Sequence, residues 1–434
     1  MAKSKKTKTE IAWGHLFEKY NILQEVERYG KYIISADEIR EFREPRLMAK
    51  FDHSINLPDL FINNNLSILP ITRGNYIISH INTYHKFEVI EKEVLHIEVP
   101  SHIQSLTPQN IKGESIALNF ALISGVFEDF LEDSELCPTV CGRMGTDKFS
   151  FEISSTIKAD TNVQIQVENS QIEIDAAYEG INYLTLIEAK CDISDDFLIR
   201  QIYYPYRVWK DKVDKEIKLV FLVYSNSVFS LYEYAFDNPN HYNSLKLKKQ
   251  KDYSIEDMSI SVSEIEKISS SVTSVEEPKV PFPQADNFKC IINLCELLMK
   301  EDLNKEDITN KYAFDNRQTD YYTNAGRYLG IIGKKQVNGE RRYFLTAEGF
   351  RYLKLPYKQR QLEYVRCILS HELFNEILIS YFKTGEMPEK SVIVDFMKKY
   401  KLYNINSDST YFRRSSTVES WISWIVCLIN YNDS

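Results

Sequence analysis

The chain has 434 residues, of which 43% are hydrophobic and 26% are charged, a composition typical of a soluble globular protein with several domains. It contains no run of about eighteen apolar residues, and its first ten residues lack an apolar signal core, so a cytoplasmic location without membrane partners is expected. Seven scattered cysteines argue against a disulfide framework. The net charge of −9 argues against a uniformly basic nucleic-acid-binding protein, although local basic patches determine where DNA binds.

Residues 1–112 alternate between helical and strand-like patterns, which predicts a mixed N-terminal domain. Arg43 and Arg46 lie on either side of Pro45, and Arg73 lies in a turn between two apolar runs. Arginines at such positions can hold phosphates or read guanine edges. They can equally form surface ion pairs, because glutamates are interleaved with the first two. Both DNA recognition and an ion-paired surface therefore stay open for this segment.

Residues 115–136 carry an apolar stripe at helical spacing, which predicts a long helix with Glu128 on a polar side. Strand patterns follow at 149–154 and 163–167. These elements precede residues 171–190, where charged residues interrupt apolar strands.

Two strand-like segments, 171–178 and 183–190, are joined by a short connection with glycine and asparagine at turn-forming positions. Asp175 lies on the first strand, and Glu188 and Lys190 end the second. Because side chains alternate along a strand, Glu188 and Lys190 point to the same face. A hairpin can bring Asp175 alongside them, which places two carboxylates and one ammonium at the end of an apolar sheet.

Burying charged groups in an apolar sheet costs free energy unless they are paired or bind a metal ion. A pair of carboxylates suits Mg²⁺, which prefers oxygen ligands and retains several waters. A bound metal ion can acidify a water and neutralise a phosphodiester, and a lysine can stabilise the attacking water or the transition state. The pattern therefore predicts magnesium-dependent phosphodiester hydrolysis, with an ordinary surface hairpin as the alternative.

The next segment, 195–213, is predicted to be mostly helical with an interruption at Pro205. Two strands at 218–224 and 228–236 complete a mixed sheet. A stretch rich in serine, glutamate and proline then breaks the pattern and predicts a linker over residues 251–285.

Three short helices are predicted at 288–299, 304–312 and 317–329, followed by two strands around an Asn-Gly turn. This order is the layout of a winged helix-turn-helix domain over residues 286–355. The polar side chains of the third helix and the hairpin that suit base edges and phosphates are Arg317, Gln318, Tyr321, Asn324, Arg327, Lys334, Lys335, Arg341 and Arg342. Winged helices also bind proteins, so the partner stays open between DNA and protein. Residues 356–434 are predicted to be a helical domain.

An aspartate on one hairpin strand and Glu-Ala-Lys on the next resemble the PD-(D/E)XK nuclease superfamily. Combined with a DNA-reading module, the chain resembles type II restriction endonucleases of that superfamily. The position before Asp175 is Ile174, where the family has a loosely kept proline. The resemblance implies that Asp175 and Glu188 bind Mg²⁺, that the Ala189 carbonyl is a further ligand, and that Lys190 supports the attacking water.

The resemblance implies further roles. A helical acid before the hairpin often adds a metal ligand in this superfamily, which makes Glu128 a candidate. The helix after the hairpin presents polar residues to the DNA backbone, which makes Gln201 and Arg207 candidates. The implied reaction is hydrolysis of double-stranded DNA to 5′-phosphate ends, by a homodimer at least on DNA, alongside a cognate DNA methyltransferase in a restriction–modification system.

The expected fold class is α+β. The expected domains are a mixed N-terminal domain at 1–112, a nuclease core at 113–250, a linker at 251–285, a winged helix-turn-helix domain at 286–355 and a helical domain at 356–434. Two alternative functions stay open: a modification-dependent or repair nuclease with the same core, and a DNA-binding regulator without enzymatic activity.

Overall fold

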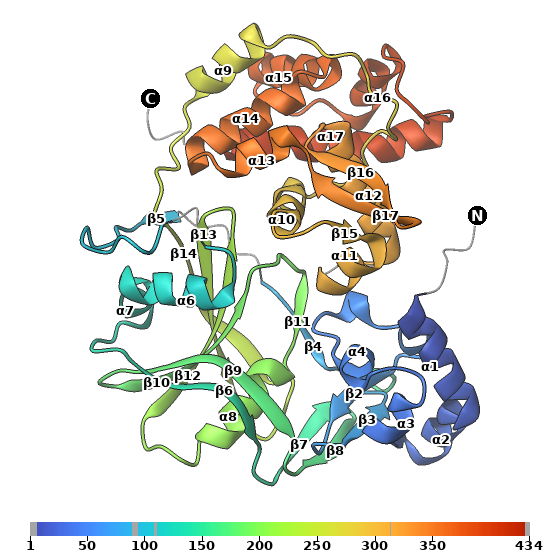
Figure 1. The fold of residues 1–434 in the computed structure, drawn as a ribbon, viewed down its shortest axis with the longest axis vertical. Coiled ribbons are helices and arrows are strands. Elements are labelled where there is room, and N and C mark those ends of the chain that lie inside the picture. The colour runs from blue at the N-terminus through green and yellow to red at the C-terminus, as the bar shows by residue number, and fades with distance from the viewer. Residues whose placement is uncertain (1–6, 89–93, 108–110, 313, 430–434) are drawn as a thin grey trace. The chain divides into compact units, whose positions relative to one another are not determined.

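The structure is a computed structural model that describes residues 7–88, 94–107, 111–312 and 314–429. Its fold class is α+β, as the sequence predicts (Figure 1). The chain forms two compact units. Unit 1 comprises Met1–Leu106, Gly113–Tyr224 and Val228–Tyr253, and unit 2 comprises Thr107–Lys112, Ser225–Ser227 and Ser254–Ser434. Within the described ranges, no helix is long and apolar enough to cross a membrane.

The first part of unit 1 folds around its own apolar core. Its elements are α1 (Lys8–Lys19), α2 (Ile22–Tyr29), β1 (Lys31–Ser35), α3 (Ala36–Arg40), α4 (Pro45–Ala49), the 3₁₀ helix η1 (Ser54–Asn56), α5 (Asp59–Asn63), β2 (Ser67–Pro70) and β3 (Asn75–Ser79). The three strands form an antiparallel sheet in the order β1-β3-β2. Trp13 is fully buried beside Phe61, and its indole Nε1 donates to the Met48 carbonyl over 2.9 Å. That bond fixes α1 to the end of α4.

The second part of unit 1 is organised around a seven-stranded sheet. Its elements are β4 (Tyr84–Lys86), β5 (Val94–His96), α6 (Glu114–Ile123), α7 (Val126–Leu131), β6 (Cys137–Gly145), β7 (Phe149–Ser154), β8 (Asn162–Val167), β9 (Gln171–Glu179), β10 (Tyr183–Lys190), β11 (Asp196–Leu198), α8 (Arg200–Trp209), β12 (Glu216–Ser225), β13 (Val228–Phe236) and β14 (Leu245–Ser254). The strand order is β5-β14-β13-β12-β10-β9-β6. β10 pairs antiparallel with β9 and parallel with β12. α8 lies in the crossover between the two parallel strands, as parallel pairing requires.

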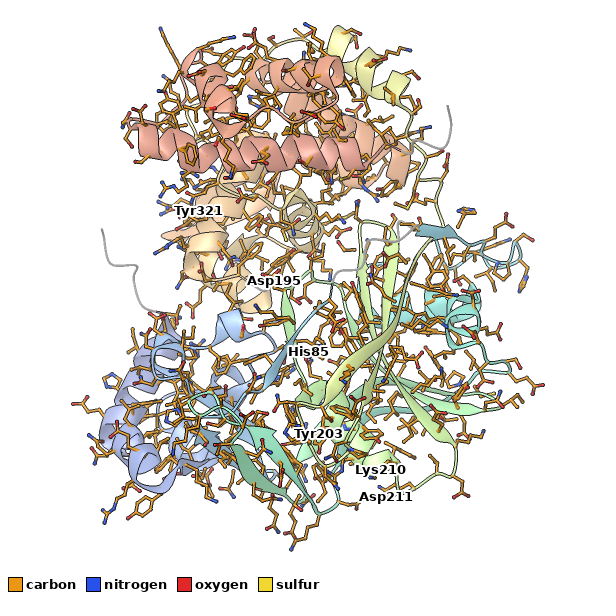
Figure 2. All side chains as sticks on the ribbon, turned by 180° about the vertical axis from the view of Figure 1, so that it is seen from behind. His85, Asp195, Tyr203, Lys210, Asp211 and Tyr321 are labelled. Atoms are coloured by element: carbon orange, nitrogen blue, oxygen red, sulfur yellow. The ribbon has the colours of Figure 1, made fainter. Side chains whose placement is uncertain are left out.

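Helices cover both faces of this sheet. Leu186 pairs with Ala177, and both belong to the apolar core that contains Tyr203 of α8, a fully buried residue labelled in Figure 2. The neighbouring residue Tyr178 points to the opposite face, where its ring lies 5.0 Å from Phe127 of α7. Figure 1 shows α6 and α7 on one side of the strands and α8 on the other. Glu188 lies on the α8 face, because Gln201 of α8 donates a hydrogen bond to its carboxylate.

Several predicted elements differ from the structure in their extent. The helix expected over 115–136 is divided into α6 and α7, because Gly125 adopts a left-handed conformation with φ of 75°. The segment 195–213 begins with the short strand β11 before α8 starts, and Pro205 lies inside α8 without ending it. Residues 251–285, expected to be a linker, contain the end of β14 and the helix α9 (Val262–Ser271).

Unit 2 is mainly helical. Its elements are α9, α10 (Phe288–Leu298), β15 (Leu303–Asn304), α11 (Lys305–Lys311), α12 (Asn316–Tyr328), β16 (Ile332–Val337), β17 (Glu340–Leu345), α13 (Ala347–Leu353), α14 (Tyr357–Leu369), α15 (Glu372–Thr384), α16 (Lys390–Lys398) and α17 (Asp408–Cys427). The strands form a small antiparallel sheet in the order β15-β17-β16. The Asp315 carboxylate caps α12 by accepting bonds from the backbone N–H groups of Arg317 and Gln318 over 2.6 Å each. Trp421 of α17 is fully buried, and its ring lies 5.3 Å from that of Phe288.

Candidate active site

The turn that joins β9 to β10 is fixed by one buried carboxylate. Asp133 accepts hydrogen bonds from the backbone N–H groups of Asn182 and Tyr183 over 3.1 Å. Burial raises the pKa of Asp133, but these backbone donors outweigh it and lower the pKa overall. Gly180 is required beside it, because a Cβ there would lie 2.3 Å from an Asp133 oxygen. These hydrogen bonds to Asp133 fix the register of the hairpin and therefore the position of every side chain along it.

The structure brings together the three residues predicted to be catalytic. The pairing of the two strands runs as far as Ile187 opposite Ala176, and just beyond it Oδ2 of Asp175 accepts from the Ala189 backbone N–H over 2.9 Å. Lys190 Nζ donates to Oε1 of Glu188 over 2.6 Å. Gln201 of α8, predicted as a DNA contact, donates from Nε2 to the same Glu188 oxygen over 2.6 Å. Strand and helix thus hold one buried carboxylate from two sides.

A further acid in the site is Glu114, the first residue of α6, which the sequence pattern does not indicate. Its Oε1 lies 4.0 Å from Lys190 Nζ. Burial raises the pKa of Glu114 and Lys190 opposes that shift. Glu128, the predicted additional acid, is exposed on α7, and in the described part of the chain it forms no ion pair with the site. One feature of the sequence could have indicated Glu114: it directly follows Gly113, where a helix can begin.

Glu188 is buried and Lys190 nearly so, and each shifts the pKa of the other. Glu188 is only 7% exposed, and burial raises its pKa to about 7, an effect that Asp175 and Asp52 reinforce and Lys190 opposes. Burial alone would lower the pKa of Lys190, but the surrounding carboxylates, led by Glu188 and Asp52, raise it well above its usual value. The lysine is therefore a permanent cation, whereas Glu188 exchanges a proton near neutral pH.

The donor set of the site fits a magnesium ion. Of the atoms that the structure describes, none donates a hydrogen bond to Oδ1 of Asp175 or Oε2 of Glu188. Oε1 of Gln201 is buried without a hydrogen-bond partner, so a water in the site has an acceptor. The described residues contain no cluster of three His, Cys, Asp or Glu side chains arranged to hold a metal. Two carboxylates supplemented by the Ala189 carbonyl and waters would suit Mg²⁺, which keeps much of its hydration shell.

Arg207 of α8, predicted as a DNA contact, binds to groups within unit 1. Arg207 donates to the carbonyls of Ser150 and Pro239 and to the Tyr203 hydroxyl, and its guanidinium lies 5.0 Å from the ring of Phe149. It therefore packs within its own unit.

The arginines predicted in the first part of unit 1 do not gather at the site. Arg43 donates to the Thr9 hydroxyl over 2.8 Å. Arg46 on α4 and Arg73 in the turn between β2 and β3 are exposed. None of the three has a hydrogen bond or ion pair to Asp175, Glu188 or Lys190 in the described residues.

The residues predicted to bind DNA in unit 2 share one helix and one hairpin. Arg317 and Arg341 are exposed. Burial lowers the pKa of Lys334, and the positive charges of Arg327 and Arg341 lower it further, so these three cations are close together. Tyr321, labelled in Figure 2, lies on α12 with the Arg414 guanidinium 6.0 Å from its ring.

The remaining predicted contacts in unit 2 have partners inside the unit. Gln318 accepts from the Asp315 N–H as part of the helix cap, and Asn324 accepts from Arg327 over 2.8 Å. Lys335 forms an ion pair with Asp302, and Arg342 donates to the Asp302 carbonyl over 3.1 Å. The exposed charge is therefore concentrated on Arg317, Lys334 and Arg341.

Comparison with known proteins divides the chain into three matched segments. Residues 10–78, 79–254 and 290–430 match families described as Domain of unknown function, namely DUF6996, DUF6997 and DUF7226 in that order. Neither a curated protein nor a solved structure matched the chain. The match over 79–254 contains Glu114, Asp175, Glu188, Lys190 and Gln201, whereas Asp52 lies in the match over 10–78.

Proposed function

We propose that the protein is a Mg²⁺-dependent endonuclease of the PD-(D/E)XK kind that cleaves double-stranded DNA at specific sequences, as type II restriction enzymes do. The observation that carries the proposal is the convergence of Asp175, Glu188 and Lys190 at the open end of the β9–β10 hairpin. Phosphodiester hydrolysis needs oxygen ligands for a hard cation next to a cation that can stabilise negative charge.

Each residue has a defined task in this proposal. Asp175 and Glu188 would hold Mg²⁺ together with the Ala189 carbonyl, and the bound ion would acidify a water and offset charge on the phosphate. Lys190 would donate to the attacking water or to the transition-state oxygens. Gln201 would orient Glu188 by donating to Oε1, which leaves Oε2 for the metal. Glu114 would keep the Lys190 ammonium near the reacting phosphate.

The arrangement of the strands also supports the proposal. An antiparallel β9–β10 hairpin, the crossover helix α8 and the parallel strand β12 are the elements that a PD-(D/E)XK core requires. Helices on both faces complete such a core.

Unit 2 would supply sequence recognition. Three helices followed by a hairpin paired with a short strand is the order of a winged helix-turn-helix domain. In that reading α12 is the recognition helix, with Arg317 facing bases or phosphates and Lys334 and Arg341 on the wing contacting the backbone. The enzyme would act in the cytoplasm as a homodimer on DNA, with a methyltransferase protecting the host sites.

Plasmid digestion tests the proposal. Purified protein is incubated with methylated and unmethylated plasmid in the presence of Mg²⁺, with EDTA as the control. Discrete fragments that require Mg²⁺ are the expected result. Cleavage restricted to methylated plasmid would favour a modification-dependent nuclease instead. A gel shift without cleavage would favour a regulator and contradict the proposal.

A further inference from the structure

The side of α12 that carries Arg317 and Tyr321 is positively charged. The two residues are four positions apart, so their side chains lie on the same side of the helix. Arg317 is exposed, and Tyr321 is half-buried. The acid of this helix, Asp320, is neutralised, because its carboxylate lies 2.6 Å from Lys305 Nζ of α11. The charge of Arg317 is therefore not offset by a carboxylate of its own helix.

Two further arginines, Arg413 and Arg414, lie near the start of α17. The acids of this helix, Asp408 and Glu419, lie 2.8 Å and 3.8 Å from lysines of α16, which offset their charges. Arg413 is exposed, and Arg414 is half-buried. In the part of the chain that the structure describes, neither arginine forms an ion pair with a carboxylate. The start of α17 therefore presents two adjacent cations without a paired acid.

Arg414 brings this charge next to α12. Its guanidinium carbon lies 6.0 Å from the centre of the Tyr321 ring, at the outer limit of a cation–π contact. Its Nε atom is buried and has no hydrogen-bond partner among the described residues. Burial and the charge of Arg413 lower the pKa of Arg414, whereas Tyr321 and Asp286 oppose this shift without cancelling it. The positive charge beside Tyr321 is thus incompletely compensated inside unit 2.

We infer that the start of α17 extends the DNA-binding surface of α12, with Arg413 and Arg414 contacting DNA phosphates; the inference rests on the proposed function. Guanidinium groups bind phosphates through charge-assisted hydrogen bonds. A helix in the major groove has phosphates on either side of it, so cations next to α12 lie where the DNA backbone passes. The DNA-binding region then includes residues of the helical segment 356–434 in addition to the winged helix-turn-helix order at 286–355.

Fluorescence anisotropy of a labelled DNA duplex tests the inference, with the full chain in EDTA at a series of salt concentrations. A duplex of arbitrary sequence suffices, because phosphate contacts carry no sequence information. For Arg413→Gln and Arg414→Gln, we expect the slope of log K against log[salt] to become shallower by about 0.9 each, which corresponds to about fivefold weaker binding at about 0.15 M salt. The double substitution should change the slope by twice as much.

Arg366→Gln on α14 is the matched control. It removes the same charge from an exposed arginine, but that guanidinium lies 3.7 Å from Glu363, so the wild-type slope is expected. Arg413→Gln is the decisive variant, because Arg413 is exposed and its replacement should not affect folding. Arg414 also packs on Tyr321, so thermal unfolding of Arg414→Gln is measured alongside its binding.

Three results would count against the inference or its foundation. A wild-type salt slope in Arg413→Gln would overturn the inference, even with weaker binding by Arg414→Gln, and would leave DNA binding by the wild-type protein intact. An equal change in Arg366→Gln would overturn it too, because the effect would then follow net charge and not position. Absence of DNA binding by the wild-type protein would contradict the proposed function itself.

Discussion

Replacing Glu188 with glutamine should stabilise the metal-free protein in a pH-dependent way. The Glu188 carboxyl has an ordinary pKa of 4.5 and a folded-state pKa of about 7, raised chiefly by burial. Between these values the folded state binds more protons than the unfolded state, so the wild-type protein loses stability as pH rises from 4.5 to about 7. The loss amounts to about 3 kcal/mol, at about 1.4 kcal/mol for each pH unit. Glutamine resembles the protonated carboxyl and does not titrate.

Urea unfolding in EDTA, followed by circular dichroism, measures this effect. We expect Glu188→Gln to exceed the wild type by about 3 kcal/mol at pH 8 and to match it near pH 4.5. Glu128→Gln is the matched control, because Glu128 is exposed on α7, and its difference from wild type should not vary with pH. A difference in unfolding free energy between Glu188→Gln and the wild type that is the same at pH 4.5 and pH 8 would refute this prediction. Ionisation of the buried Glu188 carboxyl would then not reduce the stability of the folded protein.

Four other substitutions test the site and its support. Asp175→Ala or Lys190→Ala should abolish plasmid cleavage while gel shifts show DNA binding largely retained; wild-type cleavage by either variant would remove the catalytic assignment. Arg317→Ala should weaken sequence-specific binding, measured at matched salt against Arg366→Ala on α14, and equal affinities would remove the recognition-helix assignment. Asp133→Ala should lower the free energy of unfolding by about 2–4 kcal/mol, because buried N–H groups lose a charged acceptor. A loss below about 1 kcal/mol in urea unfolding would show that the turn does not depend on Asp133.

The sequence predicted the hairpin well, because strand alternation and turn chemistry are local properties. The predicted strands 171–178 and 183–190 agree with β9 and β10 to within one residue at their ends. The strand β14 was missed, because Leu245–Ser254 is rich in lysine although it pairs inside the sheet. Several residues of β14 are buried because the strand lies between β5 and β13 in the sheet, and its sequence contains no apolar run that would predict this.

The residues around the hairpin could be predicted less well. Glu128 has helical spacing and an acidic side chain, but the break at Gly125 separates α7 from α6, and Glu114 at the start of α6 reaches Lys190 instead. Neither Glu114 nor Asp52 is near the hairpin in sequence, and no local pattern encodes which helix end or loop meets the end of a strand. The sequence predicts Gln201 as a DNA contact but does not show that its amide donates to Glu188, because that contact joins a helix to a strand thirteen residues earlier in the chain.

The acids around Lys190 come from separate segments of the chain. Asp52, Glu114, Asp175 and Glu188 all act on one buried ammonium, that of Lys190. Burial is the main cause of the raised pKa of Glu188, and the charges of Asp175 and Asp52 add to it. Lys50 lies 3.5 Å from the Asp52 carboxylate and offsets part of its charge, but the buried acids still make the site costly to form without a further cation. Anchors outside the cluster must therefore hold it together: Asp133 fixes the hairpin turn, and His53 fixes the chain beyond Lys190. A divalent cation would offset the negative charge of these acids, so the cost of burying them together would favour metal binding.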